Sequence, residues 1–233
     1  MKRIGLTLAM LLLAAEGAPP LLGAGPAHAA GAIKIGLQDD PDFLDPVRAR
    51  SYTSRIVFAS LCDKLIDTTP DLKFVPQLAL SWTWSPDNKV LTLKLRPGVV
   101  FHDGEPFDAE AVKFNLDRAR TLPESVRKSE VASIDHVDVV DPLTVNVVLK
   151  QPDAALVAQL TERSGMMLAP KATAAGNVTA NPVCSGPYKF VERVQQDRIV
   201  VEKFADYWDK DKVSIDKITY LPIVDGTVQF HRW

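Results

Sequence analysis

The sequence predicts a mixed α/β fold that contains several antiparallel hairpins. Segments 90–95 and 143–149 alternate apolar and polar residues at period two, as strands buried on one face do. Segments 54–65 and 109–120 instead repeat their apolar residues at helical spacing. The 233 residues are 46% hydrophobic and 24% charged, as in soluble globular chains. This length suits one large domain or two small ones, and the composition excludes a disordered or collagen-like chain.

The N-terminal third predicts a strand, a turn-rich segment and a helix. Residues 33–37, Ile-Lys-Ile-Gly-Leu, are interpreted as a short first strand. Residues 38–46 are rich in Asp and Pro, which favour turns. The helical spacing in 54–65 predicts a helix, and the Asp-Thr-Thr-Pro-Asp run at 67–71 ends it.

A hairpin is predicted next, with strands at 81–85 and 90–95 joined by a turn at 86–88. Because successive side chains in a strand point to opposite faces, one set of leucines should face the core. This set is Leu91, Leu93 and Leu95. The run Phe101-His102-Asp103-Gly104 follows as a tight corner.

Residues 109–120 predict a helix with Asp108 as its N-cap, and Pro123 lies beyond its end. Phe114 lies away from the expected buried stripe, so it should pack against another element or line a cleft. The expected buried stripe consists of Val112, Leu116 and Ala119.

The remaining elements are short. Two further hairpins are predicted, with strands at 131–140 and 143–149 and at 188–193 and 198–204. A short helix is expected at 154–161 and a last strand at 215–223. The inward set of the first of these hairpins is Val145, Val147 and Leu149.

The N-terminus has the features of a secretory signal peptide. Lys2 and Arg3 precede an apolar run at 4–15, and Ala27-His28-Ala29 is a cleavage box. A membrane-spanning helix needs roughly 20 apolar residues, and Glu16 ends this run too early. We therefore expect export to the periplasm with cleavage near Ala29, which changes the net charge from −2 to −3.

The chain has two cysteines, Cys62 and Cys184. In an oxidising compartment an even pair favours a disulfide, and the alternative is two buried thiols. Closing so long a loop would stabilise the fold by about 4–5 kcal/mol in the chain-entropy model.

Several kinds of chemistry lack their sequence signals. The net charge of −2 argues against nucleic-acid binding. The sequence contains neither a G-x-S-x-G elbow nor an H-E-x-x-H motif. Asp39, Asp40 and Asp42 lack the spacing of a calcium loop and are interpreted as a turn. We therefore expect no catalytic residues, no metal site and no cofactor.

Six groups of residues occur in a specific order along the chain. They are Leu44-Asp45-Pro46, Pro76-Gln77-Leu78-Ala79 with Ser81-Trp82, the run from Leu91 to Phe107 that includes Arg96-Pro97-Gly98-Val99 and Phe101-His102-Asp103-Gly104, Ala109-x-x-Val112-x-Phe114, Ser185-Gly186-Pro187-Tyr188, and Tyr207-Trp208 with Ile215-Asp216-Lys217-Ile218. In this order they resemble the signature of the peptide/nickel (dipeptide/oligopeptide-binding) solute-binding proteins that serve ABC importers. The resemblance covers residues 33–223.

The resemblance implies a periplasmic binding protein-like fold of class II, with two lobes that close on the ligand about a hinge. Members of this family have a discontinuous first lobe and are roughly twice this length. The resemblance therefore implies that residues 30–225 form an incomplete N-terminal lobe, between the signal peptide 1–29 and an aberrant tail at 226–233.

The implied function is capture of peptides or a similar small solute for an ABC permease in the inner membrane, by a monomer without enzymatic activity. One alternative is a truncated remnant that binds nothing, and a less favoured one is a secreted hydrolase.

The resemblance also indicates candidate ligand contacts. The segment before the first helix is expected to face the cleft and to pair its backbone with an extended peptide, as in β-augmentation. The segment that follows Cys184 is expected to present backbone near the hinge. The candidate residues are Arg50, Ser51, Tyr52, Thr53, Phe114, Asn115, Ser185 and Gly186.

Overall fold

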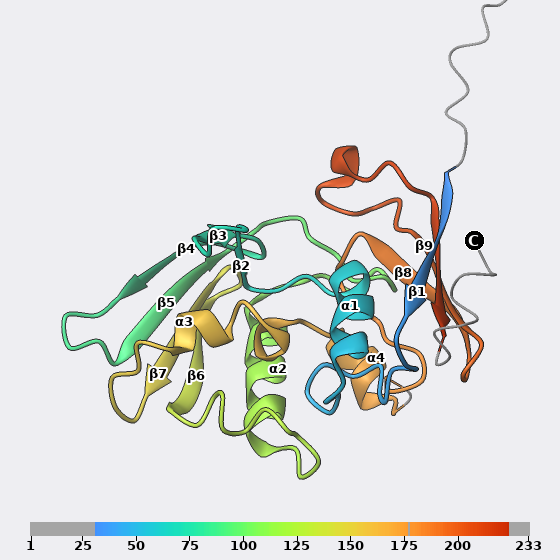
Figure 1. Ribbon diagram of the computed structural model, residues 1–233. Helices are drawn as coiled ribbons and strands as arrows, with labels where there is room; N and C mark the ends of the chain where they lie inside the picture. Colours follow the sequence, from blue (N-terminus) through green and yellow to red (C-terminus); the bar gives the residue numbers. More distant parts are fainter. Residues whose placement is uncertain (1–30, 177, 224–233) are drawn as a thin grey trace, which may run out of the picture.

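The structure is a computed structural model that describes residues 31–176 and 178–223 (Figure 1). Two four-stranded sheets form its two ends. Helices α1 (Tyr52–Leu61), α2 (Ala109–Thr121) and α4 (Pro170–Ala174) lie between them in the view of Figure 1. This arrangement confirms the mixed α/β class and its antiparallel hairpins.

The first sheet is entirely antiparallel and contains two of the predicted hairpins. Its strand order is β4 (Ala79–Trp84), β5 (Val90–Leu95), β7 (Thr144–Leu149) and β6 (Ile134–Asp141). Leu93 pairs with Trp82 on one side and Val145 on the other. Both predicted inward sets are buried, which confirms the face that period two assigned to the core.

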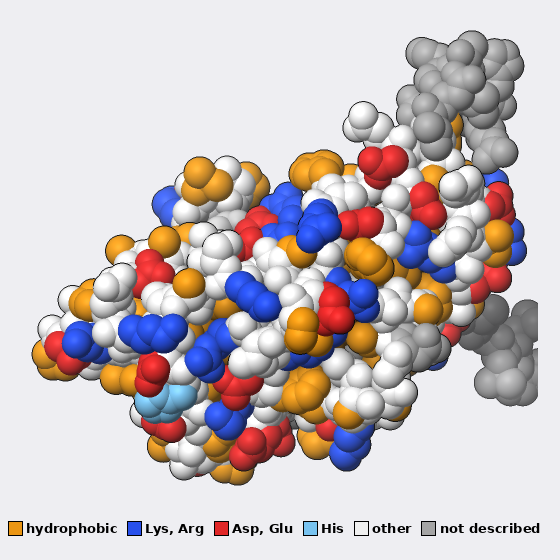
Figure 2. All heavy atoms as spheres, turned by 90° about the horizontal axis from the view of Figure 1, so that it is seen from below, with side chains coloured by type: hydrophobic (Ala, Val, Ile, Leu, Met, Phe, Trp, Pro, Cys, Tyr) orange, Lys and Arg blue, Asp and Glu red, His pale blue; other side chains and the backbone are white. Residues whose placement is uncertain are grey.

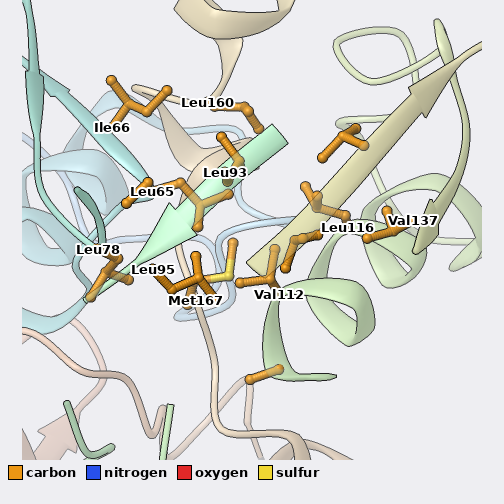
Figure 3. Packing of buried hydrophobic residues seen from close by; sticks show 14 of the residues in the cluster. Leu65, Ile66, Leu78, Leu93, Leu95, Val112, Leu116, Val137, Leu160 and Met167 are labelled. Carbon is orange, nitrogen blue, oxygen red and sulfur yellow. The ribbon is translucent and has the colours of Figure 1, made fainter. Parts of the chain in front are cut away.

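Helix α2 covers the buried face of this sheet. Asp108 caps it as predicted, because its side chain accepts a hydrogen bond from the Ala111 N–H at 2.9 Å. Val112, Leu116 and Ala119 are fully buried, as the helical spacing predicted. Figure 3 shows Val112 and Leu116 packed with Leu93, Leu95 and Met167 in one apolar cluster.

The second sheet joins the two ends of the described chain. Its strand order is β1 (Ala32–Leu37), β10 (Lys217–Pro222), β9 (Arg198–Lys203) and β8 (Tyr188–Val194). Strand β1 runs parallel to β10, and Ile33 pairs with Ile218. The other pairs are antiparallel. The hairpin of β8 and β9 was predicted, whereas the partner of β1 was not.

Helix α1 packs against the second sheet and gives it a separate apolar cluster. Val57, Phe58 and Leu61 are fully buried on this side of the helix. The predicted helix at 54–65 is displaced toward the N-terminus. Ser51 caps α1 by accepting a hydrogen bond from the Ser54 N–H at 3.1 Å, and Cys62 leaves helical geometry with φ −125° and ψ 117°.

Some short elements differ from the predictions. Residues 67–71, predicted only as a break, belong partly to a two-stranded sheet, and the predicted helix at 154–161 is reduced to one turn. These elements are β2 (Ile66–Thr68), β3 (Phe74–Pro76), α3 (Leu156–Gln159) and the 3-10 turns η1 (Arg163–Gly165) and η2 (Lys210–Lys212). Such short elements depend on tertiary contacts, because one or two turns are not stable alone.

The predicted signal peptide 1–29 and tail 226–233 lie outside the described residues. Within 31–176 and 178–223, no helix is both long enough and apolar enough to span a membrane.

Candidate functional site

The outward face of α1 presents a row of side chains to solvent. Tyr52, Arg55, Ile56 and Ala59 follow the spacing of one helix face, opposite the buried Val57 side. Tyr52 is 69% exposed, which is unusual for so large an apolar ring. The Arg55 guanidinium lies 6.0 Å from the centre of this ring. The row therefore offers aromatic and cationic groups beside each other.

A hollow of about 370 Å³ adjoins this face of α1. The hollow is bordered by charges of both signs. Arg55 donates to Glu162 in a two-pronged ion pair, with Nε 2.7 Å from Oε2, and Lys64 pairs with Asp67. The lining residues are Arg55, Ile56, Ala59, Cys62, Lys64, Asp67, Gln77, Thr161, Glu162 and Met166. The hollow thus combines two ion pairs with an apolar wall.

Asp42 fixes the start of α1. Its carboxylate accepts hydrogen bonds from the Arg50 N–H at 2.7 Å, from the Ser54 hydroxyl at 2.7 Å and from Ser51. Burial would raise the pKa of Asp42, but these hydrogen bonds together lower it to about 2. The Asp-rich turn read from the sequence is therefore an anchor for the helix.

The backbone before α1 is already paired within the chain. The N–H groups of Arg50 and Ser51 bond to Asp42. Arg163 donates to the carbonyls of Ala49 at 3.0 Å and Ser51 at 3.2 Å. These backbone groups therefore already have partners within the chain, which leaves fewer of them for the expected β-augmentation.

The four candidates at 50–53 differ in position. Arg50 and Tyr52 are exposed, and Ser51 is half-buried as the N-cap. Thr53 is buried, and its hydroxyl donates to the Asp39 carboxylate. Arg50 and Tyr52 can therefore present side chains to a solute, whereas Thr53 stabilises the turn.

Phe114 and Asn115, which belong to α2, do not line the hollow beside α1. Phe114 lines a separate hollow on the outward side of α2, and that hollow shares no lining residue with the one beside α1. Asn115 is 4% exposed; its amide donates to the Leu168 carbonyl at 2.8 Å and accepts from the Leu168 N–H at 3.0 Å. The expectation that Asn115 lines the cleft is wrong, because its side chain pairs with buried backbone.

Ser185 and Gly186 are also buried. The Gly186 N–H donates to the Leu61 carbonyl at 2.9 Å. A Cβ atom at this position would lie 2.5 Å from the carbonyl carbon of Leu61. The segment therefore presents its backbone to the end of α1 and not to an open cleft, which corrects the expected role.

Cys62 and Cys184 are joined by a disulfide, with their Cα atoms 4.9 Å apart. His102 lies beside it. Its Nδ1 accepts from the Cys184 N–H at 3.3 Å, so Nε2 carries the proton and donates to the Gly186 carbonyl at 3.1 Å. Burial lowers the pKa of His102 to about 4, which keeps the ring neutral.

Sequence reasoning missed most of the hollow. The helical spacing of Arg55, Ile56 and Ala59 was a usable signal for one wall. Glu162 has no local signal, because it lies 107 residues from Arg55 in the chain. Among the described residues, no group of three or more His, Cys, Asp or Glu side chains is placed to hold a metal ion.

The charged side chains are intermixed on the face shown in Figure 2, where Lys and Arg lie between Asp and Glu. The binding of a polyanion such as nucleic acid generally uses a continuous basic surface. This face, by contrast, presents both signs side by side.

The fold is that of periplasmic binding proteins. The structure of the binding protein AgaA from A. tumefaciens R10, in complex with agropinic acid, matches with a TM-score of 0.80 and 31% identity. The match covers 86% of this chain and 41% of that one. The unliganded open form of the murein tripeptide binding protein MppA matches with a TM-score of 0.79 over 90% of this chain and 45% of that one, at 24% identity.

The sequence comparisons define the family. Residues 73–232 match the bacterial extracellular solute-binding proteins, family 5. The glutathione-binding protein GsiB of Pectobacterium atrosepticum is 37% identical over 220 residues, which cover 93% of this chain and 43% of GsiB. GsiB of Salmonella typhimurium is 34% identical with the same coverage. The chain belongs to this solute-binding family and spans less than half the length of these relatives.

Proposed function

We propose that this chain supplies one wall of the ligand cleft in a periplasmic solute receptor of an ABC importer. Family membership supports the class of protein. The observation that carries the proposal is the row of Tyr52 and Arg55 beside the hollow on α1. An exposed aromatic ring next to a concave, mixed-charge surface is suited to hold a small organic solute.

The lining of the hollow favours a small zwitterionic solute, such as a short peptide. Arg55 and Lys64 can attract a carboxylate, and Glu162 and Asp67 can attract an ammonium group. Ile56 and Met166 offer apolar contact. A relative named for binding glutathione is consistent with this class.

The rest of the proposal concerns the path of the solute. The N-terminal segment directs export to the periplasm with cleavage near Ala29. The receptor acts as a monomer, closes on its solute by a hinge motion and delivers it to an ABC permease in the inner membrane. It forms no covalent intermediate and is not an enzyme.

Isothermal titration calorimetry with a solute panel tests the proposal. The panel contains glutathione, dipeptides, agropinic acid and a nickel–histidine complex. We expect one of these solutes to bind measurably, and about tenfold weaker binding in R55A, which corresponds to ~1.4 kcal/mol. Arg198→Ala is the matched control, because Arg198 is also a partly exposed arginine in ion pairs, on β9.

Three outcomes separate the candidate functions. Binding that R55A weakens and R198A leaves unchanged supports the receptor wall. No heat with any solute favours the non-binding remnant. Turnover of ester or peptide substrates by the purified chain would support the secreted hydrolase and contradict the proposal.

A further inference from the structure

Asp63 is a buried carboxylate that joins the end of α1 to two other segments, one at Gln77 and one at Tyr207 and Trp208. It is 2% exposed and follows the disulfide-bonded Cys62 at the end of α1. Its Oδ1 accepts from the Gln77 amide at 2.9 Å and from the Tyr207 hydroxyl at 3.2 Å. Its Oδ2 accepts from the Trp208 indole at 2.6 Å. All three donors are neutral groups.

The surrounding charges do not neutralise this carboxylate directly. The Lys64 ammonium group pairs with Asp67 on the wall of the hollow. Arg96 stacks on the Trp208 ring, 3.7 Å from its centre, and donates to the Gln77 carbonyl at 2.9 Å. A buried carboxylate without a paired cation is costly to keep ionised. The ionised form of Asp63 is therefore destabilised, which favours binding of a proton by its carboxylate.

Only one of the three donors can become a hydrogen-bond acceptor when Asp63 is protonated. The Trp208 indole can only donate a hydrogen bond. The Gln77 amide is held in its orientation, because its Oε1 accepts from the Lys64 N–H at 2.8 Å. The Tyr207 hydroxyl is the one group of the three that can reverse from donor to acceptor. Protonation of Oδ1 would thus turn the Tyr207 hydroxyl and weaken the hold on Gln77.

We propose that Asp63 is a positioning residue whose protonation state sets how firmly Gln77 and the Tyr207–Trp208 segment are held against the wall of the hollow. Cys62, Lys64 and Gln77, which flank or contact Asp63, all line the hollow beside α1. A change at the carboxylate therefore reaches that wall through one hydrogen bond. The junction exists whether or not the hollow binds a solute, so its test needs no ligand.

The proton exchange falls in an accessible range. Burial, the largest effect, raises the pKa of Asp63 to about 7, while the hydrogen bonds from Trp208 and Tyr207 oppose the shift. The negative charge of Asp67 raises this pKa further, and the positive charge of Lys64 lowers it. On the adjoining segment, the pKa of Tyr207 is raised by its own burial and by Asp63 and Asp209, so its hydroxyl stays protonated.

The test follows the Trp208 indole N–H by nuclear magnetic resonance of the full chain between pH 5 and 9. The indole signal is assigned with W208F. We expect it to titrate with a midpoint near 7, because its acceptor changes charge, while the signals of Trp82 and Trp84 do not follow this titration. In D63N, which keeps the shape but has no ionisable group, the Trp208 titration should disappear.

Asp67→Asn is the matched control. It removes a nearby carboxylate on the same hollow but leaves the junction intact, so the Trp208 titration should persist with a lower midpoint. A Trp208 signal that stays constant from pH 5 to 9, or that titrates unchanged in D63N, would overturn the proposal. If D63N does not fold, the carboxyl carbon signals of the unmodified protein decide, since the proposal requires one aspartate that titrates near neutral pH.

Discussion

Gly186 lies where two backbone segments come within van der Waals contact, the end of α1 and the segment before β8. A Cβ atom there would lie 2.5 Å from both the carbonyl carbon and the carbonyl oxygen of Leu61. These are backbone atoms and cannot move aside as a flexible side chain could. The need for glycine at this position is therefore steric and concerns packing.

We expect Gly186→Ala to lower the free energy of unfolding by about 2–3 kcal/mol, because the added methyl group forces the two segments apart. Urea unfolding measures the change. Gly31→Ala is the control, since a Cβ atom there meets its nearest neighbour at 3.5 Å, and it should cost well under 1 kcal/mol. Equal stability of the two variants would show that the contact at Gly186 is relaxed in solution.

At the scale of elements, the corner between β5 and α2 is tied to the segment before β8. His102 bonds to Cys184 through both its backbone N–H and its ring, and its ring edge meets Phe204 at 5.0 Å between centres. Gly104 gives the corner its turn with a φ of +85°, a conformation that favours glycine. The predicted tight corner thus also contacts the two segments that flank the β8–β9 hairpin.

Low pH should reduce the contribution of His102 to the free energy of unfolding. Burial lowers the pKa of His102 from its ordinary value of 6.5 to about 4 in the fold. Its contribution to stability is therefore complete above pH 6.5 and is lost as the pH falls toward 4. The loss amounts to up to about 3 kcal/mol, since one pKa unit corresponds to about 1.4 kcal/mol.

Chemical denaturation between pH 4 and 8 measures this effect as the difference between the unmodified chain and H102Q. Asp63, whose raised pKa gives the opposite slope, is present in both proteins and cancels in the difference. A difference that does not change with pH would contradict the assigned role of the ring.

Local pairing explains which elements could be predicted. The hairpin strands β4 and β5 are close in sequence, and their alternation identified the buried leucines. Strand β1 was predicted as a strand, but its partner β10 lies at the far end of the chain. No periodicity within β1 can identify that partner.

At the scale of the whole molecule, the described chain has two apolar clusters, one under each sheet. The Cys62–Cys184 disulfide lies in the second cluster. It is next to His102, in the corner that follows β5, and the Cys184 N–H donates to the His102 ring. The bond spans 122 residues of sequence and fixes the end of α1 to the segment before β8. It thereby holds one side of the hollow in place, because Cys62 lines it.

Reduction of this disulfide should lower the free energy of unfolding by about 5 kcal/mol, because a long loop regains its freedom in the unfolded chain. Urea unfolding with and without dithiothreitol measures the change, with a thiol assay to verify reduction. The double variant C62S/C184S should be less stable and indifferent to the reductant. An unchanged unfolding midpoint in fully reduced protein would rule out this contribution.

The sequence by itself determined the α/β class, the hairpins, the inward faces of β5 and β7 and the N-cap of α2. It also carried the ordered motifs that indicated the family. The hairpins, the inward faces and the N-cap depend on residues within about one hairpin or helix of each other, so their signals are local.

Only the tertiary structure decided the roles of the candidate site residues. Tyr52 is exposed on the row beside the hollow, whereas Asn115 and Gly186 are buried against backbone from distant segments. The partners of Arg55 and Asp63, Glu162 and Trp208, also lie more than 100 residues away in the chain. Burial and hydrogen bonding depend on which distant segments meet, and the spacing of residues along the chain does not contain that information.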